Sequence, residues 1–523
     1  MLPRIFVSIA SYRDTECQWT VKDLFEKASH PERVFVGICW QFIREEDDDC
    51  FLVSTRPAQC RVIEVDARQS RGVCWARARV QQLWQGEEFY FQIDAHSRFA
   101  RGWDETLLAM WAACPSPKAV LSAYPASYEP PDRLGPDIVA TITAKDFDPR
   151  GLLSFGSRGV PQAQAPASPS PTPFLGAGLL FGPSEFIREV PYDPYIYFTG
   201  EEITLAARLW THGWDLYSPN RVTVYHEYAP RPNKKRHWHD HKLWTELSAR
   251  AVKRVRYLLD REPCDDPLAL EDIEKYSLGT QRSLADYEAF AGVDFGRKLI
   301  GGLTQEELEA SLPEEARRAR VRERFTEIWR NNAWGARETR SGPGSTLAQT
   351  EVLRPALQQA FADLGIRRLV DAGCGDLNWM QRISVELELY LGLDIVPELV
   401  DDLRSRFQAR KHHFFNVADI SFDVLPSADA ILCRDVLGHL SQPLVLQALA
   451  CFRRSGSRYL IATTFARGGN VANRVGSWTP VDLCAAPFNL PAPLFTVEEG
   501  FGKGGKCLGV WPVARLPALP PPA

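Results

Sequence analysis

The 523-residue chain is too long for one ordinary hydrophobic core, and its length predicts more than one domain. Hydrophobic residues make up 45% of it and charged residues 24%, close to the average for soluble globular proteins. The net charge of −5 gives no field that attracts a polyanion, so nucleic acid is a disfavoured partner.

Several classes of protein are excluded by short patterns. No apolar run reaches the roughly 18 residues that cross a bilayer, so we expect no membrane span. The start, MLPRIFVSIASYRD, is too quickly charged for a secretory signal and predicts a first β-strand. The twelve cysteines include no CxxC pair and no framework spacing, as expected for free thiols in a reducing compartment. We therefore expect a cytoplasmic protein.

The first half alternates short strand-like runs with helical patterns. The predicted strands cover residues 5–10, 34–39, 61–65, 89–93 and 119–123, and predicted helices cover 18–28 and 74–84. This alternation predicts a mostly parallel α/β sheet with ligands at the carboxyl ends of its strands. The Pro-, Ala- and Ser-rich stretch 159–173 is expected to be a mobile surface loop within this domain.

A second alternating series follows a charged helical stretch, residues 298–322. Its predicted strands cover residues 368–371, 389–394, 428–433 and 458–463. We therefore predict a first domain over 1–297, a helical linker over 298–322 and a second domain over 323–523.

A candidate metal site follows the predicted strand at 89–93, in FYFQIDAHSRFARGWD. Asp94 and His96 stand two residues apart, so both side chains leave the strand end in the same direction. A carboxylate and an imidazole can share a divalent cation, which in turn can hold a diphosphate. On the tripeptide alone, a strand-end turn with a chance histidine is the favoured interpretation. Trp103 fits either the core or an acceptor platform.

Several motifs around this site, in this order, resemble those of GT-A glycosyltransferases. IFVSIASYRD resembles their first strand and uridine-binding turn, and RGVCWARARVQQLW their nucleotide-contacting helix. FLGAGLLFGPSEF and FTGEEITLAARLWTHGWDLYSPNRVTVYH resemble the sugar-binding segment of polypeptide N-acetylgalactosaminyltransferases. Over residues 1–295 the chain is most similar to cytoplasmic N-acetylglucosaminyltransferases that modify hydroxyproline.

The resemblance implies retaining transfer from a UDP-sugar, expected to be UDP-N-acetylglucosamine, with Mn2+ or Mg2+ as the metal. His226 then matches a third metal ligand beside Asp94 and His96; its alternative is a core histidine. Glu201 would contact hydroxyls of the donor sugar, while Glu202 is either its catalytic partner or a charge favouring the helix start. The residues matching the uracil and diphosphate contacts are Ser11, Tyr12, Arg13, Asp14 and Arg77.

The basic stretch from Arg231 to Lys242 contains three alternating histidines, His237, His239 and His241. Their spacing would suit zinc on a strand, but the cations at 234–236 beside them repel a metal. We interpret the stretch as a basic lid that closes near the diphosphate.

A second candidate site lies in RRLVDAGCGDLNW, where Asp371 precedes Gly373 and Gly375. Glycines at a strand-to-helix turn let the backbone approach a ligand closely. Asp394, at the end of the next strand, can accept from both ribose hydroxyls of a nucleoside. Asp419 follows the third strand, where it could meet an adenine amine.

This order resembles class I S-adenosylmethionine-dependent methyltransferases over residues 321–515. The resemblance places Asp435 and His439, in CRDVLGHL, near the methyl-bearing sulfur. His439 would be the base for O-methyl transfer, with Asp435 as the alternative base; His439 could instead cap the turn before Ser441. A dinucleotide-binding domain is disfavoured because the glycine pattern is Gly-x-Gly-x-x-Asn.

Two features of this half leave its role open. Leu377 replaces the third glycine of the motif, so the site could be impaired. The run from Ser341 to Ser345 fits either a loop over the cofactor or a plain turn between helices.

The sequence therefore predicts an α/β protein in which a GT-A-type nucleotide-sugar-binding domain precedes a class I, Rossmann-like methyltransferase domain. The predicted function is bifunctional: sugar transfer to an acceptor hydroxyl, then O-methylation of the product, plausibly of the sugar just added. The alternative is an active glycosyltransferase whose second domain only binds S-adenosylmethionine or the acceptor. The acceptor could be a glycan, a peptide or a protein.

Overall fold

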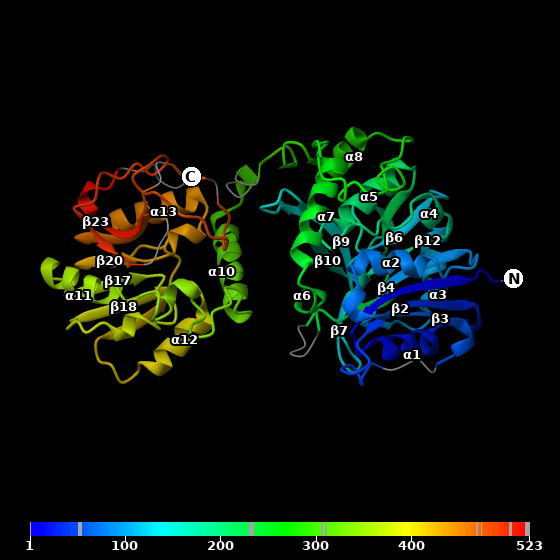
Figure 1. Ribbon diagram of the computed structural model, residues 1–523, viewed down its shortest axis with the longest axis horizontal. Coiled ribbons are helices and arrows are strands. Elements are labelled where there is room, and N and C mark those ends of the chain that lie inside the picture. Colours follow the sequence, from blue (N-terminus) through cyan, green and yellow to red (C-terminus); the bar gives the residue numbers. More distant parts are fainter. Residues whose placement is uncertain are drawn as a thin grey trace. The chain divides into compact units, whose positions relative to one another are not determined.

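The computed structural model describes residues 2–50, 55–229, 235–304, 307–308, 311–466, 469–471, 473–500 and 505–517. The chain forms two compact units, Met1–Leu308 and Glu309–Ala523, and Figure 1 labels the elements of each. Residues 231–234 of the basic stretch and residues 305, 306, 309 and 310 of the predicted linker lie outside the described residues. Among the described helices, none combines the length and apolar character that crossing a bilayer requires.

The first unit is built on an eight-stranded sheet with the order β11-β13-β6-β12-β4-β1-β2-β3. The strands are β1 (Ile5–Tyr12), β2 (Val34–Phe42), β3 (Cys60–Asp66), β4 (Phe89–Asp94), β6 (Ala119–Ser122), β11 (Ser170–Pro171), β12 (Leu179–Pro183) and β13 (Asp215–Ser218). β1 runs parallel to β2 and β4, β2 to β3, and β13 to β6, whereas β12 is antiparallel to both neighbours. The prediction of a mostly parallel sheet is confirmed.

Helices cover both faces of this sheet because its strands are apolar on both sides. Ile5 and Val7 of β1 pack with α1 and α3, and Phe6 between them packs with α2, α5 and α7 on the other face. These helices are α1 (Cys17–Lys27), α2 (Val73–Gln81), α3 (Trp103–Ala112), α5 (Glu201–Thr211) and α7 (Trp244–Leu259). Trp103 is fully buried and its Nε1 donates to the Leu24 carbonyl at 2.9 Å, so of its two predicted roles the structure shows the core one.

A four-stranded sheet, β5-β14-β7-β8, stands beside the end of β4. Its strands are β5 (Ser97–Phe99), β7 (Ala126–Glu129), β8 (Arg133–Leu134) and β14 (Val224–His226). The antiparallel register of β14 with β5 puts His226 opposite Ser97, the residue after His96. Pairing of the backbone thus brings together histidines that are 130 positions apart in the sequence.

The prediction that 159–173 forms a surface loop is wrong in part. Its first residues complete β10 (Leu153–Pro161), which pairs with β9 (Ile138–Phe147), and β11 pairs with β13 at the edge of the main sheet. The composition indicated poor core packing, but a largely exposed hairpin and an edge strand need only backbone pairing, and proline is tolerated at both places. The remaining elements of this unit are α4 (Glu185–Glu189), α6 (His237–Asp240), α8 (Leu284–Ala291), β15 (Val293–Asp294) and β16 (Leu299–Ile300).

The second unit is a seven-stranded sheet with the order β19-β18-β17-β20-β21-β23-β22. Its strands are β17 (Arg368–Ala372), β18 (Leu389–Asp394), β19 (His413–Val417), β20 (Ala430–Cys433), β21 (Tyr459–Phe465), β22 (Phe495–Glu498) and β23 (Lys506–Pro512). All neighbours are parallel except the pairs that β23 makes with β21 and β22. α10 (Glu314–Arg330) and α13 (Gln442–Arg454) pack on one face, α11 (Leu353–Leu364) and α12 (Pro397–Arg406) on the other. The predicted α/β fold class is confirmed for both units.

Two candidate active sites

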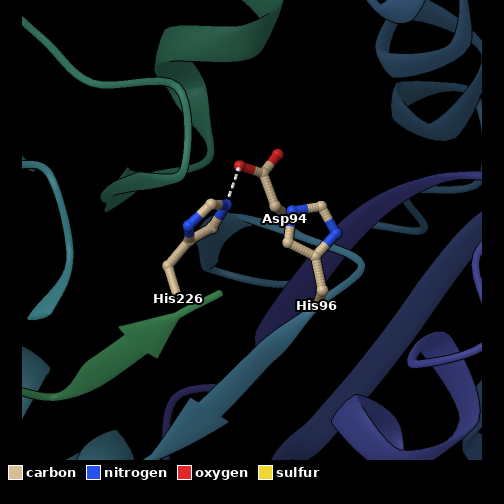
Figure 2. A group of neighbouring side chains, drawn as sticks. All are labelled: Asp94, His96 and His226. Carbon is tan, nitrogen blue, oxygen red and sulfur yellow. Dashed lines mark ion pairs between the residues drawn. The ribbon is translucent and has the colours of Figure 1, made fainter. Parts of the chain in front are cut away.

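A cleft of about 750 Å³ opens in the first unit where β1 and β4 end. Asp94, His96 and His226 line it, and each offers one ligand atom within 4.8 Å of the other two. Nε2 of His226 is 3.2 Å from Oδ2 of Asp94. A dashed line marks this ion pair in Figure 2. One carboxylate and two imidazoles form a donor set that suits a divalent cation.

Asp14 holds the ring of His96 in place. Its Oδ2 lies 2.8 Å from Nδ1 of His96. In Figure 2 one ring nitrogen of His96 points toward Asp94 and His226 and the other points away from them. Because Nδ1 is bonded to Asp14, Nε2 is the nitrogen that faces the other two candidate ligands. A carboxylate behind a ligating histidine fixes its tautomer and orientation.

Arg77 of α2 links the candidate metal ligands to the start of α5. Its guanidinium donates to Oδ1 of Asp94 at 2.7 Å, to Tyr192 Oη at 3.2 Å and to Glu201. Burial by itself would raise the pKa of Asp94, but the hydrogen bond from His226 and the charge of Arg77 outweigh it and hold that pKa well below its ordinary value. The carboxylate of Asp94, a candidate metal ligand, is therefore ionised at neutral pH.

Glu201 and Glu202 both line the cleft but have different surroundings. Glu201 is buried and accepts from Arg77 and from the Tyr192 hydroxyl. Glu202 accepts from the amide of Ala177 and from the Tyr124 hydroxyl, each at 2.8 Å. Burial raises the pKa of Glu202 to about 7.

The glycine-rich segment before β12 brings the backbone close to this cluster. A Cβ on Gly178 would lie 3.0 Å from Oδ2 of Asp94, and Gly178 also lines the cleft. The absence of a side chain there leaves room around the carboxylate.

The residues predicted to bind uracil are divided by the structure. Tyr12 and Asp14 line the cleft, whereas Ser11 and Arg13 are buried and are not among its lining residues. Arg13 forms ion pairs with Asp47 at 2.8 Å and with Asp240 at 3.0 Å. These contacts tie the turn after β1 to the turn that contains Asp47 and to helix α6.

Part of the basic stretch also reaches the cleft. Residues 235–238 line it, and the short α6 is held by Tyr12 Oη, which donates to Asp240 at 2.8 Å. Nδ1 of His237 lies 2.7 Å from Tyr197 Oη, and its ring stacks on His241 at 3.9 Å between centroids. His239 is exposed and does not line the cleft.

A second cavity, of about 410 Å³, lies at the carboxyl ends of β17, β18 and β20. Two glycines shape its floor. Gly373 has φ +86°, and a Cβ there would lie 2.3 Å from the Val436 side chain. Gly375 has φ +56°, and a Cβ there would lie 2.3 Å from Ser341 Oγ. Leu377, which stands in place of the third glycine, is buried and also adopts positive φ, +58°, a conformation uncommon for residues other than glycine.

Three acidic residues predicted to hold a nucleoside line this cavity. Asp394 accepts from the amides of Gly375 and Val396, each at 3.1 Å. Asp371 accepts from Tyr390 Oη at 2.6 Å. Burial raises the pKa of Asp371 to about 7 and the pKa of Asp419 to about 6. Asp371, Asp394 and Asp419, from three consecutive strand ends, thus meet at one cavity.

Asp435 and His439 also line the cavity. The pKa of each is lowered, which favours the charged form of Asp435 and the neutral form of His439. Burial would raise the pKa of Asp435, but Arg434 and Lys506 outweigh it and lower that pKa; Lys506 Nζ donates to Oδ2 of Asp435 at 2.6 Å. Burial lowers the pKa of His439, whose Nδ1 lies 2.9 Å from the Ser477 carbonyl oxygen. Of the two predicted bases, His439 is the neutral one.

The run from Ser341 to Ser345 lies over this cavity and lines it along its whole length. A Cβ on Gly344 would lie 3.0 Å from Oδ2 of Asp435. The structure therefore places this run as a loop over the site.

Several residues of both sites were missed by sequence reasoning. In the first unit these are Tyr124 and Tyr192; in the second they are Trp334, Arg434, Trp478, Glu499 and Lys506. The two tyrosines stand outside every motif with a recognisable spacing. Lys506 is the first residue of β23, and no sequence pattern indicated that it pairs with Asp435, 71 positions earlier.

Comparisons with known proteins match the first unit to a family. Residues 4–57 and 52–297 match the model of the glycosyltransferase (GlcNAc) family, together more than half of the chain. A search of curated proteins found no match. Among solved structures, GalNAc-T7 with UDP, GalNAc and Mn2+ is 15% identical, with a TM-score of 0.39 over 55% of this chain. The match spans 57% of the GalNAc-T7 chain.

The second unit is similar to methyltransferase structures. Magnesium protoporphyrin IX methyltransferase from Synechocystis PCC 6803, with bound SAH, is 18% identical over 37% of this chain and 98% of its own, with a TM-score of 0.27. The Burkholderia thailandensis 1,6-didemethyltoxoflavin-N1-methyltransferase is 16% identical over 38% and 90%, with a TM-score of 0.28. The predicted fold class, a GT-A-type unit followed by a class I methyltransferase-type unit, agrees with the two sheets. By the match of its first 297 residues, the chain belongs to the glycosyltransferase (GlcNAc) family.

Proposed function

We propose that the protein is a bifunctional transferase. Its first unit transfers a sugar, N-acetylglucosamine, from UDP to an acceptor hydroxyl with retention, and its second unit O-methylates the product. The observation that carries the first activity is the cluster of Asp94, His96 and His226 in a cleft of a glycosyltransferase-family chain. The second activity is supported by the glycine-floored cavity with its acidic residues.

In the first site, Asp94, His96 and His226 would hold Mn2+ or Mg2+. The metal supplies positive charge against a departing nucleotide diphosphate. Asp14 keeps His96 oriented, and His226 together with Arg77 keeps Asp94 ionised. Glu201 and Glu202 border the same cleft. Glu201 would accept hydrogen bonds from hydroxyls of the donor sugar, with Glu202 as its partner. No side chain is assigned as a covalent nucleophile; electrostatic stabilisation of the leaving group carries the reaction.

In the second site, Asp394 would accept from ribose hydroxyls and Asp419 from an adenine amine. S-adenosylmethionine supplies an electrophilic methyl group when bound. His439 takes the proton from the acceptor hydroxyl, because it is neutral and its Nδ1 is already bonded to a carbonyl. Asp435, paired with Lys506, is the weaker base and serves to organise the wall of the site.

We place this function in a reducing compartment such as the cytoplasm. All twelve cysteines are free, and most are buried as small apolar side chains. The acceptor hydroxyl belongs to a glycan, a peptide or a protein.

The test is a screen of UDP-sugar hydrolysis and transfer with Mn2+. We expect Asp94→Ala and His96→Ala to abolish metal-dependent turnover while leaving S-adenosylmethionine binding intact. His30→Ala is the matched control, because His30 is a histidine of the same unit outside the cleft. Hydrolysis at the parent rate in either site variant would remove the metal assignment. S-adenosylmethionine binding without any methyl transfer would leave the second unit as a binding module.

A further inference from the structure

Four tryptophans line the second cavity, and two of them, Trp334 and Trp478, lie next to the turn that carries His439. The indole of Trp334 lies 4.6 Å from the His439 ring, tilted by 33°. Trp478 also borders the cavity, yet 54% of its surface is exposed. An indole left half in solvent at a cavity wall leaves a large apolar surface for a ligand.

Trp478 belongs to a segment, residues 473–479, that is fastened to the turn carrying His439. Asn473 Nδ2 donates to the Gly438 carbonyl at 2.6 Å, and the Thr479 amide donates to the same oxygen at 2.9 Å. The Gly476 amide donates to the His439 carbonyl at 2.9 Å. Bonds on both sides of Trp478 hold the backbone that carries its exposed indole next to the turn of His439.

The same segment determines which ring nitrogen of His439 carries the hydrogen. A carbonyl oxygen can only accept, so at 2.9 Å from Ser477 O the Nδ1 atom must carry the hydrogen. In the neutral ring Nε2 then has the lone pair. The group that orients the base and the group that offers an aromatic surface are therefore adjacent residues, Ser477 and Trp478.

The charges beside His439 pair with one another. Lys506 bonds Asp435 at 2.6 Å and Glu499 at 2.9 Å, and Arg434 bonds Glu499 at 2.7 Å. No net charge remains in this group of four residues to select a charged acceptor. What the wall offers a second substrate is aromatic surface next to a proton acceptor.

We propose that Trp334 and Trp478 form a sugar-binding subsite, and that the acceptor of the second unit is the neutral pyranose ring of a glycoside. A pyranose has an apolar C–H face that packs on indole and a hydroxyl edge that needs a base. This inference rests on the proposed methyl transfer and adds the class of acceptor and the residues that select it.

The experiment is saturation-transfer NMR of methyl N-acetyl-α-glucosaminide, the anomer that retaining transfer would produce, on the full chain with S-adenosylhomocysteine present. We expect Trp478→Ala to weaken glycoside binding at this cavity about tenfold, the loss of one aromatic stacking contact. Trp478→Phe keeps an aromatic face and should retain most of the binding. Trp334→Phe tests the second wall with little risk to the 341–345 loop, which packs on Trp334 through Gly342. Trp19→Ala, at an exposed tryptophan of α1, is the matched control.

Calorimetry with S-adenosylhomocysteine on the same variants separates the possible failures. The first cleft is unchanged in all of them, so the difference between parent and Trp478→Ala reports the second cavity alone. Equal glycoside signals in both, with S-adenosylhomocysteine bound in both, would overturn the subsite and leave methyl transfer standing. Failure of the parent to bind S-adenosylhomocysteine would overturn the proposed function itself. Loss of signal in Trp478→Ala with an unchanged dissociation constant for S-adenosylhomocysteine supports the proposal.

Discussion

Oδ2 of Asp14 lies 2.8 Å from Nδ1 of His96, so a carboxylate just after β1 orients a candidate metal ligand just after β4. Such second-layer contacts set the affinity of a metal site nearly as strongly as the ligands themselves. The pair leads to the first prediction.

Asp14→Ala should weaken Mn2+ binding about 10–100-fold, because His96 loses the bond that fixes its ring. Asp14→Asn should lose less, since an amide oxygen can still accept from Nδ1. Calorimetric titration of the full chain with MnCl2 measures both, with Glu105→Gln, an exposed carboxylate of α3, as the control. An unchanged dissociation constant in Asp14→Ala would mean that Asp14 acts elsewhere in the cleft, as in the uracil contact first predicted.

The limits of sequence reasoning are visible at this pair. Strand ends such as Asp94 and Asp394 could be predicted because short, mostly apolar runs end where polar residues begin. The tight turn at Gly373 and Gly375 could be predicted because glycine is the residue that most readily adopts the positive φ found at both positions. The partner of His96 could not, since Asp14 is brought to it by the parallel register of β1 with β4, which no local pattern encodes.

The same reason explains the other omissions. Trp478 and Lys506 reach the second cavity from segments after β21, and only packing of the whole unit determines which of their side chains face it. The prediction of a surface loop over 159–173 was wrong in part for another reason. Its composition correctly indicated little burial, but strands β10 and β11 form from backbone pairing that composition does not report.

Asp394→Ala should weaken S-adenosylmethionine binding by about 1.5–3 kcal/mol, the cost of removing a charged hydrogen-bond acceptor. It should leave UDP-sugar hydrolysis unchanged, because the first cleft shares no residue with the second. Titration calorimetry gives the dissociation constant. Asp363→Asn, at the exposed end of α11, is a control carboxylate of the same unit. Affinity equal to the parent in Asp394→Ala would mean that the ribose lies elsewhere.

The stability of the second unit should fall as the pH rises from about 4 to 7, through Asp371. Burial raises the folded-state pKa of this carboxyl to about 7, above its unfolded value of 3.8. Between these values the unfolded chain releases a proton that the folded chain keeps, so rising pH favours unfolding. Asp371→Asn keeps an acceptor for Tyr390 and removes this titration. The pH-dependent part of the free energy of unfolding that it removes is on the order of 2–4 kcal/mol. Thermal unfolding from pH 4.5 to 8 should show a shallower decline in the variant; parallel curves would contradict the assignment.

The chain should separate near residues 300–320 into two soluble pieces, because each unit has its own hydrophobic clusters. Limited proteolysis followed by mass spectrometry of the fragments tests this. Cleavage within 159–173 is the competing result, but β10 and β11 should protect much of that stretch. Fragments that can be expressed only as aggregates would show that neither unit is stable without the other.

The methyl group should be added to the sugar that the first unit has just transferred. Tethering two active sites raises the effective concentration of the first product at the second site, and this benefit exists only if both act on one molecule in sequence. The expected result is that labelled methyl from S-adenosylmethionine enters the acceptor only when UDP-sugar is also supplied. Fragmentation mass spectrometry should then locate it on a sugar hydroxyl. Asp94→Ala provides the control. Given UDP-sugar and unglycosylated acceptor, it should transfer no sugar and therefore add no methyl group, although it still binds S-adenosylmethionine. Supplying that variant with pre-glycosylated acceptor should restore labelling. Equal labelling with and without UDP-sugar, or label on the aglycone, would show that the two units share a chain but not a substrate.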